Sequence, residues 1–483
     1  MIFPPKKYSC GLFALLICCT GLPAQTIIPR DSLMQTPAPE NEQSAVSSFI
    51  IRNIDITGNK KTKPSIILRE LPFKPGEAFT LQQLVQKFET ARRQLMNTAL
   101  FHDVVVALKN SEGVYADILV EVKERWYLFP AIYFRPVDRN LNQWIVEQKA
   151  SLKRVNYGAK ILYFNTSGRN DKLEASVSGG YTRQLSFSYE RPYFDKKLKW
   201  GWNAGFAIGK NREVNYNTID NKQVFFKDES QFIRNFIYAR TEITYRKAIN
   251  TKHRIGIAYT QEEVKDTVLA LNPDYFKSGS NHIRVPELYY AMTYYNLDYI
   301  PYPTKGYAAE VFVGKKGINR TFNLWQLSVK GLGSWPLMPK TFLSLRVLGH
   351  LKLPFKQPFF NQRIFGYGDM QLQGYEYYVM DGVAGALIKT SVTREVINFK
   401  IRMPHKKDKD GLQVPFRIFA KVYGNTGYAH NPRPGENFLT NKLLYSGGLG
   451  IDIVSLYDFT FKLEWSFNQL GQNGLFLHHK SLF

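Results

Sequence analysis

Apolar and polar residues alternate along DFTFKLEWSF, residues 458–467, near the end of the chain. The odd positions are all apolar, and the even positions are all polar or charged. Since a strand turns successive side chains to opposite faces, this stretch predicts a strand with one apolar and one charged face. In a soluble sandwich the apolar face packs in the core. In a membrane barrel it contacts lipid, and the charged face lines a watery interior.

Alternating stretches of this kind recur through residues 125–483. Examples are KWGWNAGFAIG, RIGIAYT and RIFAKVYGNTGY, and turn clusters such as NTSGRND and NPRPGEN separate them. Sixteen membrane strands of about 10 residues would use about 160 residues and leave roughly 12 for each connection. We therefore predict a mainly β fold, a transmembrane antiparallel β-barrel of about 16 strands, with the apolar face of residues 458–467 against lipid.

Residues 47–124 have a different pattern, which predicts one small α+β domain. A strand over FIIRNIDITGN precedes a short helix with Pro64 in its first turn, and the loop PFKPGEAF follows. Thr80 and Gln83 form a capping-box pattern at the start of a second helix. The strands FHDVVVALK and VYADILVEVKE, joined by the turn NSEG, complete the order β-α-α-β-β. The second helix is expected to bury one apolar stripe: Leu81, Leu84, Val85, Phe88, Ala91 and Leu95.

The first 24 residues are typical of an export signal. Lys6 and Lys7 precede the apolar run CGLFALLICCTG, which is too short to span a bilayer comfortably. We place cleavage after Ala24. A lipoprotein signal at Cys18 or Cys19 is the alternative, but neither follows the small residue that such a signal needs. Residues 25–46 contain Pro, Ser and Thr without periodicity, and we expect a flexible tether.

Catalytic and metal-binding patterns are missing from the sequence. All three cysteines lie in the signal, so the exported chain is expected to have no disulfide, thiolate metal site or cysteine nucleophile. The eight histidines are scattered, and the chain has no HExxH, GxSxG, P-loop or EF-hand pattern. We therefore expect that the protein is not an enzyme and has no catalytic residue, metal or cofactor.

The net charge and the aromatic content of the chain indicate which binding partners to expect. The formal net charge is +24, with the positive residues spread along the chain. An exported protein rarely meets nucleic acid, so we expect no nucleic-acid partner and assign the charge to solvated loops and to anionic lipid headgroups. Aromatic residues make up 14% of the chain, which suits the interface girdles of a membrane barrel.

The N-terminal domain resembles a POTRA domain through the pattern I-x-I-x-G-N at residues 54–59, the helix and the pattern I-x-V-x-V-x-E at residues 118–124. POTRA domains occur in the BamA/TamA-like superfamily of outer-membrane barrels, which includes the two-partner-secretion transporters. The resemblance implies that a sheet edge binds extended polypeptide through main-chain hydrogen bonds. The implied partners are unfolded outer-membrane or secreted polypeptides. The candidate edge carries His102, Val104, Val106 and Leu108.

The segment QRIFGYGDMQLQGYEYYVMDGV carries a second resemblance. Family members place an aliphatic-Arg-Gly-aromatic tetrad at the tip of an extracellular loop that folds into the lumen. The resemblance implies that the corresponding tetrad here is Leu372, Gln373, Gly374 and Tyr375, approached through Phe365, Gly366 and Gly368. The family also has an acidic residue on the inner wall, for which Glu395 is our first candidate and Asp381 the second.

Gln373 departs from the family arginine. A guanidinium can hold a carboxylate with two charge-assisted hydrogen bonds, whereas an amide carries no charge. Either the loop docks through Gly374 and Tyr375 with neutral hydrogen bonds from Gln373, or the loop moves more readily. We favour the first alternative.

The resemblance runs from about Phe49 to Phe483, whose terminal aromatic side chain matches the assembly signal of outer-membrane barrels. It implies a bacterial outer-membrane barrel with its N-terminal domain in the periplasm. We expect it to insert client proteins into the membrane through a seam between the first and last strands. The alternatives are a dedicated two-partner secretion transporter and a passive porin. With one POTRA-like module, accessory envelope proteins or a narrow client set are also expected.

Overall fold

The computed structural model describes residues 48–138, 143–318, 322–368, 370–405 and 408–479. The expected signal, the expected tether and Phe483 lie outside the described residues. No helix in the described part of the chain is long and apolar enough to cross a membrane.

The N-terminal domain is a four-stranded sheet in the order β2–β1–β4–β3 with two helices. The predicted order β-α-α-β-β is confirmed, with one addition. The short strand β2 lies where a loop was predicted, because its backbone pairs antiparallel with the start of β1. The elements are β1 (Ser48–Thr57), α1 (Pro64–Glu70), β2 (Ala78–Thr80), α2 (Leu81–Asn97), β3 (Phe101–Glu112) and β4 (Tyr115–Glu124).

Helix α2 begins with the predicted capping box. The backbone N–H of Gln83 donates to Thr80 Oγ1 at 3.2 Å, and the Thr80 N–H donates to Gln83 Oε1 at 2.9 Å. The apolar stripe is narrower than predicted, because Leu81 and Val85 are 59% and 55% exposed. A helix of 3.6 residues per turn carries these two positions around its side, away from the sheet. The residues that do reach the core are Leu84, Phe88, Ala91 and Leu95.

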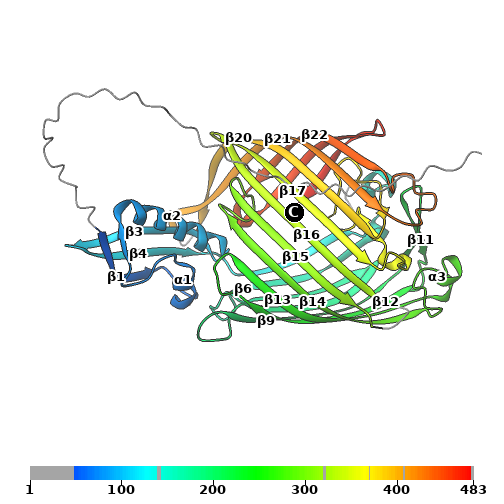
Figure 1. Cartoon of the computed structure of the whole chain (residues 1–483), viewed down its shortest axis with the longest axis horizontal. Helices are drawn as coiled ribbons and strands as arrows, with labels where there is room; N and C mark the ends of the chain where they lie inside the picture. The colour runs from blue at the N-terminus through cyan, green and yellow to red at the C-terminus, as the bar shows by residue number, and fades with distance from the viewer. Residues whose placement is uncertain (1–47, 139–142, 319–321, 369, 406–407, 480–483) are drawn as a thin grey trace, which may run out of the picture. The chain divides into compact units, whose positions relative to one another are not determined.

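The rest of the described chain forms a 16-stranded sheet in which neighbouring strands are antiparallel and follow in chain order, apart from short elements within the loops. The strands run obliquely around a barrel (Figure 1). Its strands are β5 (Leu128–Pro136), β6 (Val155–Phe164), β7 (Lys172–Gly180), β8 (Thr182–Arg191), β9 (Trp200–Asn211), β12 (Arg234–Tyr245), β13 (Thr251–Val264), β14 (His282–Leu297), β15 (Gly306–Lys316), β16 (Leu324–Met338), β17 (Thr341–Leu353), β20 (Ala384–His405), β21 (Asp408–His430), β22 (Leu443–Val454), β23 (Thr460–Asn468) and β24 (Asn473–His479).

Strand β23 shows which face of the barrel is apolar. Trp465 and Phe467 are each 51% exposed, whereas Glu464 and Ser466 are each 1% exposed. The apolar residues of 458–467 therefore point away from the barrel interior and the polar ones point into it. This is the arrangement of a membrane barrel, in which the apolar face contacts lipid.

The connections differ between the two ends of the barrel. Several turns at one end are short, while long connections at the other carry further elements, of which α3 and β11 are labelled near one another in Figure 1. These elements are the hairpin β10 (Glu213–Ile219) and β11 (Lys222–Lys227), α3 (Asp266–Leu271), the π-turn Gln143–Glu147, the 3-10 turns Leu152–Arg154 and Phe359–Asn361, and the strand pair β18 (Arg363–Phe365) and β19 (Met380–Asp381). A further 3-10 turn, Leu456–Asp458, connects β22 with β23 at the opposite end.

The helices of the N-terminal domain contact the short turns of the barrel. Glu70 at the end of α1 is 2% exposed, and its carboxylate accepts two hydrogen bonds from Arg246, at 2.6 and 2.9 Å. Arg69 donates to the Leu198 carbonyl at 2.8 Å, and Asn97 at the end of α2 donates to the Leu297 carbonyl at 3.1 Å. These contacts hold the domain against the barrel end that carries the short turns.

Candidate functional site

Residues 354–368 and 370–383 between β17 and β20 fold onto the inner wall of the barrel, and we call them the lumen loop. Phe365, Leu372 and Tyr375 are at most 3% exposed. They belong to one apolar cluster with wall residues such as Leu387 and Leu444. Apolar burial of this kind gives the loop a defined position inside the barrel.

Three glycines of the lumen loop have a left-handed backbone: Gly366, Gly368 and Gly374, with φ values of 81°, 59° and 88°. At Gly374 a Cβ atom would lie 3.2 Å from the Phe467 carbonyl oxygen and 3.3 Å from Ser446 Cβ. The Gly374 carbonyl accepts a hydrogen bond from Asn468 Nδ2 at 2.7 Å. Both the φ angle and the close approach to the wall therefore require glycine here.

Two tyrosine hydroxyls of the lumen loop form hydrogen bonds with β22 and with the turn before β24. The Tyr375 hydroxyl donates to the Tyr445 carbonyl of β22 at 3.2 Å. Burial raises the pKa of the Tyr375 phenol to about 12. Tyr378 accepts a hydrogen bond from Gln472 Nε2, in the turn before β24, at 2.9 Å. The docking contacts thus come from Gly374, Tyr375 and Tyr378.

Gln373 faces a polar cavity between the loop and the wall, which we call the lumen cavity. Its amide forms no hydrogen bond with the residues that the structure describes. The lumen cavity is lined by Tyr302, Pro303, Phe342, Ser344, Arg346, Gln371, Gln373, Lys389, Thr390, Ser391, Thr393, Lys421, Tyr423, Asn425, Asp452, Lys462, Glu464 and His478.

Glu395 and Asp381, the acidic partners expected for Gln373, do not line this cavity. Glu395 lies on β20 with its carboxylate 2.6 Å from Arg417, and Asn398 also donates to it. Asp381 belongs to the loop itself, in β19, and is 3% exposed. Burial raises the pKa of its carboxyl group, which favours the neutral acid.

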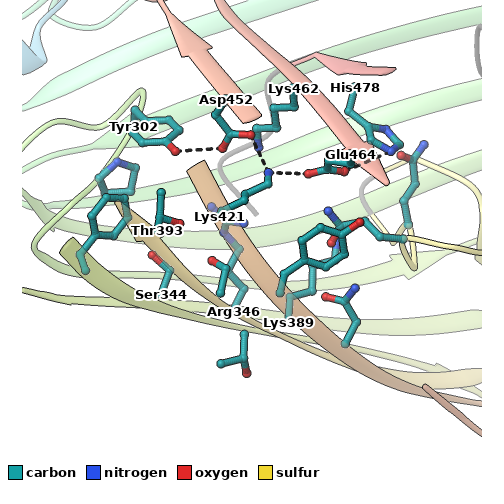
Figure 2. Close-up of a pocket in the computed structure, with 18 residues that line it drawn as sticks. Tyr302, Ser344, Arg346, Lys389, Thr393, Lys421, Asp452, Lys462, Glu464 and His478 are labelled. Atoms are coloured by element: carbon teal, nitrogen blue, oxygen red, sulfur yellow. Dashed lines mark hydrogen bonds and ion pairs between the residues drawn. The ribbon is translucent and has the colours of Figure 1, made fainter. Parts of the chain in front are cut away.

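The acids that do face the cavity are Asp452 of β22 and Glu464 of β23. Lys421 Nζ lies 2.6 Å from Asp452 and 2.5 Å from Glu464, as Figure 2 shows. The Tyr302 hydroxyl donates to Asp452 at 2.9 Å. Neither acid is a candidate on sequence grounds, although the alternation of residues 458–467 places Glu464 on the charged face.

His478 connects these acids to the lumen loop. Its Nε2 atom lies 3.4 Å from Glu464 and 3.2 Å from Glu376 of the loop. Glu376 also accepts a hydrogen bond from the Gly374 N–H at 3.1 Å. Since His478 belongs to β24, the network runs from the loop tip to the last strand of the barrel.

Replacing Gln373 with arginine is expected to weaken loop docking. The new guanidinium would face Arg346, Lys389 and Lys462, while the two acids of the cavity already pair with Lys421. We expect faster proteolysis of the lumen loop in the folded barrel. Gln373→Met, which adds no charge, should behave like the wild type. Slower proteolysis of Gln373→Arg would show that the arginine finds a carboxylate.

In the N-terminal domain, β3 is an edge strand of the sheet, and it contains the four residues expected at the client edge. Val104 is 1% exposed and faces the core, whereas Leu108 is 40% exposed. Arg92 Nε donates to the Val104 carbonyl at 3.1 Å, so one acceptor of the edge is already bonded. Any pairing along this edge would therefore use its other main-chain groups.

Comparisons with known proteins give the family. Residues 165–455 match the Omp85 superfamily domain, and residues 49–125 match the POTRA family described as a surface antigen variable number repeat. An outer membrane protein assembly factor of Treponema pallidum is 36% identical over 87 residues, which are 18% of this chain and 9% of that protein. The match therefore spans less than a tenth of that relative.

Two solved structures match most of this chain. CdiB from Escherichia coli has a TM-score of 0.53 at 9% identity, with 89% of this chain and 75% of that chain covered. BamA from Haemophilus ducreyi lacking POTRA domains 1–3 has a TM-score of 0.47 at 16% identity, with 89% and 83% covered.

The Omp85 match covers more than half of the chain, and the fold agrees with it: a 16-stranded barrel with an apolar outer face and a POTRA domain before it. Members of this superfamily are assembly and transport factors. The chain therefore belongs to the Omp85 superfamily and is an outer-membrane protein whose POTRA domain lies in the periplasm.

Proposed function

We propose that this protein inserts client polypeptides into the outer membrane through a lateral opening between β5 and β24. One observation carries the proposal: among the described residues, no ladder joins these two terminal strands of the sheet. Each strand then has one edge of main-chain N–H and C=O groups without a strand partner. Leaving such groups unsatisfied in lipid costs several kcal/mol, so an extended client strand would be stabilised by pairing with them.

The POTRA domain would supply the client. Strand β3 at the sheet edge is suited to strand addition, in which main-chain hydrogen bonds give affinity with little dependence on sequence. Contacts such as Glu70 with Arg246 keep this domain at the barrel end where the client arrives. Unfolded outer-membrane polypeptides are the proposed clients, the lipid bilayer with its anionic headgroups is the second partner, and accessory envelope proteins would assist a single POTRA module.

The lumen loop supports insertion at the seam over passage through the lumen. It packs against the inner wall and contacts β22, β23 and the turn before β24. A dedicated secretion transporter or a porin would need this loop to leave its position. Because the loop contacts the last strands, a movement of these strands when the seam opens would also move the loop.

A disulfide across the seam tests the proposal. Cysteine pairs, one in β5 and one in β24, are introduced into the full chain in proteoliposomes, and insertion of a client barrel is followed by its protease protection. We expect oxidation to abolish insertion and reduction to restore it, with the barrel folded throughout. The control disulfide Ile451→Cys/Leu463→Cys joins residues already paired in β22 and β23 and should have no effect.

Full insertion by the oxidised seam variant would contradict the proposal. Export of one soluble protein by that variant, with no loss of client barrels, would instead favour a dedicated secretion transporter.

A further inference from the structure

Two cations face each other directly on the inner wall of the barrel. Arg346 of β17 and Lys389 of β20 are cross-strand partners in the antiparallel ladder, and both line the lumen cavity. Figure 2 shows them side by side. The Cβ atoms of such partners are about 5 Å apart, and like charges placed directly opposite each other destabilise a sheet. An anion bound between the two side chains would relieve this repulsion.

The described part of the protein does not supply that anion. Arg346, Lys389 and the nearby Lys462 form no ion pair or hydrogen bond with the described residues, and Arg346 Nε is buried without a hydrogen-bond partner. The acids Asp452 and Glu464 are held by Lys421. Asp452 also accepts from Tyr302, and Glu464 contacts His478.

The charges near the cavity leave a positive excess. Four cations line it, namely Arg346, Lys389, Lys421 and Lys462, against the two carboxylates of Asp452 and Glu464. Glu376 of the lumen loop, beyond His478, adds a third carboxylate to this group. An excess of cationic side chains in a partly enclosed lumen attracts an anion more strongly than the same charges exposed to bulk water.

We propose that the lumen cavity binds one oxyanion of the phosphate class between Arg346 and Lys389. The planar guanidinium can donate two parallel hydrogen bonds to neighbouring oxygens, and the ammonium can act as a compact charge on a third. A phosphate group offers these acceptors together with a charge of about −1.5 to −2. Its source is either free inorganic phosphate or the phosphoryl group of a lipid headgroup. This inference is independent of insertion through the seam.

Inorganic phosphate is the first probe. The full chain in detergent micelles is titrated by calorimetry at constant ionic strength in chloride. We expect one site in the wild type and at least tenfold weaker binding in Arg346→Gln and in Lys389→Gln. The control is Lys252→Gln, which removes a barrel lysine paired with Glu190 at 2.9 Å, and it should change the affinity less than twofold.

Thermal unfolding gives a second readout. In phosphate-free buffer Arg346→Gln should be at least as stable as the wild type, because the like-charge contact with Lys389 is gone. Phosphate should raise the Tm of the wild type but not that of the variants. If Arg346→Gln fails to fold, as judged by heat-modifiable migration, Lys389→Gln carries the same comparison.

Two outcomes would overturn the proposal: no phosphate binding by the wild type at tens of millimolar, or equal binding by the wild type and the Arg346→Gln/Lys389→Gln double variant. The two possible sources of the phosphate group are then distinguished in nanodiscs of phosphatidylcholine with or without phosphatidic acid. Weaker apparent phosphate binding with phosphatidic acid would support a headgroup as the occupant. Unchanged binding would support free phosphate.

Discussion

Replacing Arg246 with methionine is expected to destabilise the contact between the POTRA domain and the barrel by about 3–5 kcal/mol. This is the usual cost of removing one partner of a buried ion pair. Glu70 is 2% exposed and would lose both hydrogen bonds from Arg246. Arg69 is the remaining cation, with its Nη1 atom 3.8 Å from the Glu70 carboxylate, and it already donates to the Leu198 carbonyl. The carboxylate would therefore stay buried with little compensation.

Hydrogen exchange of the α1 amides in the full chain measures this effect. For amides that exchange through local opening, a loss of 3 kcal/mol in stability makes hydrogen exchange about 10²-fold faster. The double variant Arg246→Met/Glu70→Gln should recover most of the protection, because no charge is left buried. Lys109→Met, which breaks the exposed pair with Asp55, should cost less than about 1 kcal/mol. Equal exchange in the single and double Arg246 variants would contradict the prediction.

Replacing Gly374 with valine is expected to displace the lumen loop from the wall. A residue with a Cβ atom at φ 88° costs about 1–2 kcal/mol, and the contacts at 3.2 and 3.3 Å add about 1–3 kcal/mol of overpacking. The hydrogen bonds from Asn468 to Gly374 and from Tyr375 to Tyr445 depend on the same backbone position. We therefore expect the loop to leave its docked position in a large fraction of molecules.

Conductance in planar bilayers measures this change, because a lumen without its loop should pass ions more freely. Gly368→Val is a matched control: its φ is 59°, but a Cβ atom there would have no other atom within 4 Å. The Gly368→Val variant has the backbone strain without close contacts to the wall, and its conductance should be much lower than that of Gly374→Val. If both variants conduct like the wild type, the loop does not control the lumen.

Local patterns in the sequence determined the elements and their faces. The alternation of residues 458–467 predicts strand β23 and its apolar side, because side-chain direction in a strand depends only on the period of the backbone. The capping box at Thr80 and Gln83 likewise involves residues three apart. The barrel follows from the repetition of such strands, since main-chain groups left unpaired in lipid are costly and neighbouring strands pair them.

Only the tertiary structure decided which side chains meet. Glu395 and Glu464 both lie in strands of the barrel, yet of these two only Glu464 lines the cavity. Lys421 contacts it there across the ladders that join β21, β22 and β23. Arg246 and Glu70 are 176 residues apart, and nothing local marks them as partners. Arg346 and Lys389 face each other only through the register of β17 with β20. Strand register over long sequence separations is set by the whole sheet, and so these contacts could not be predicted from the sequence alone.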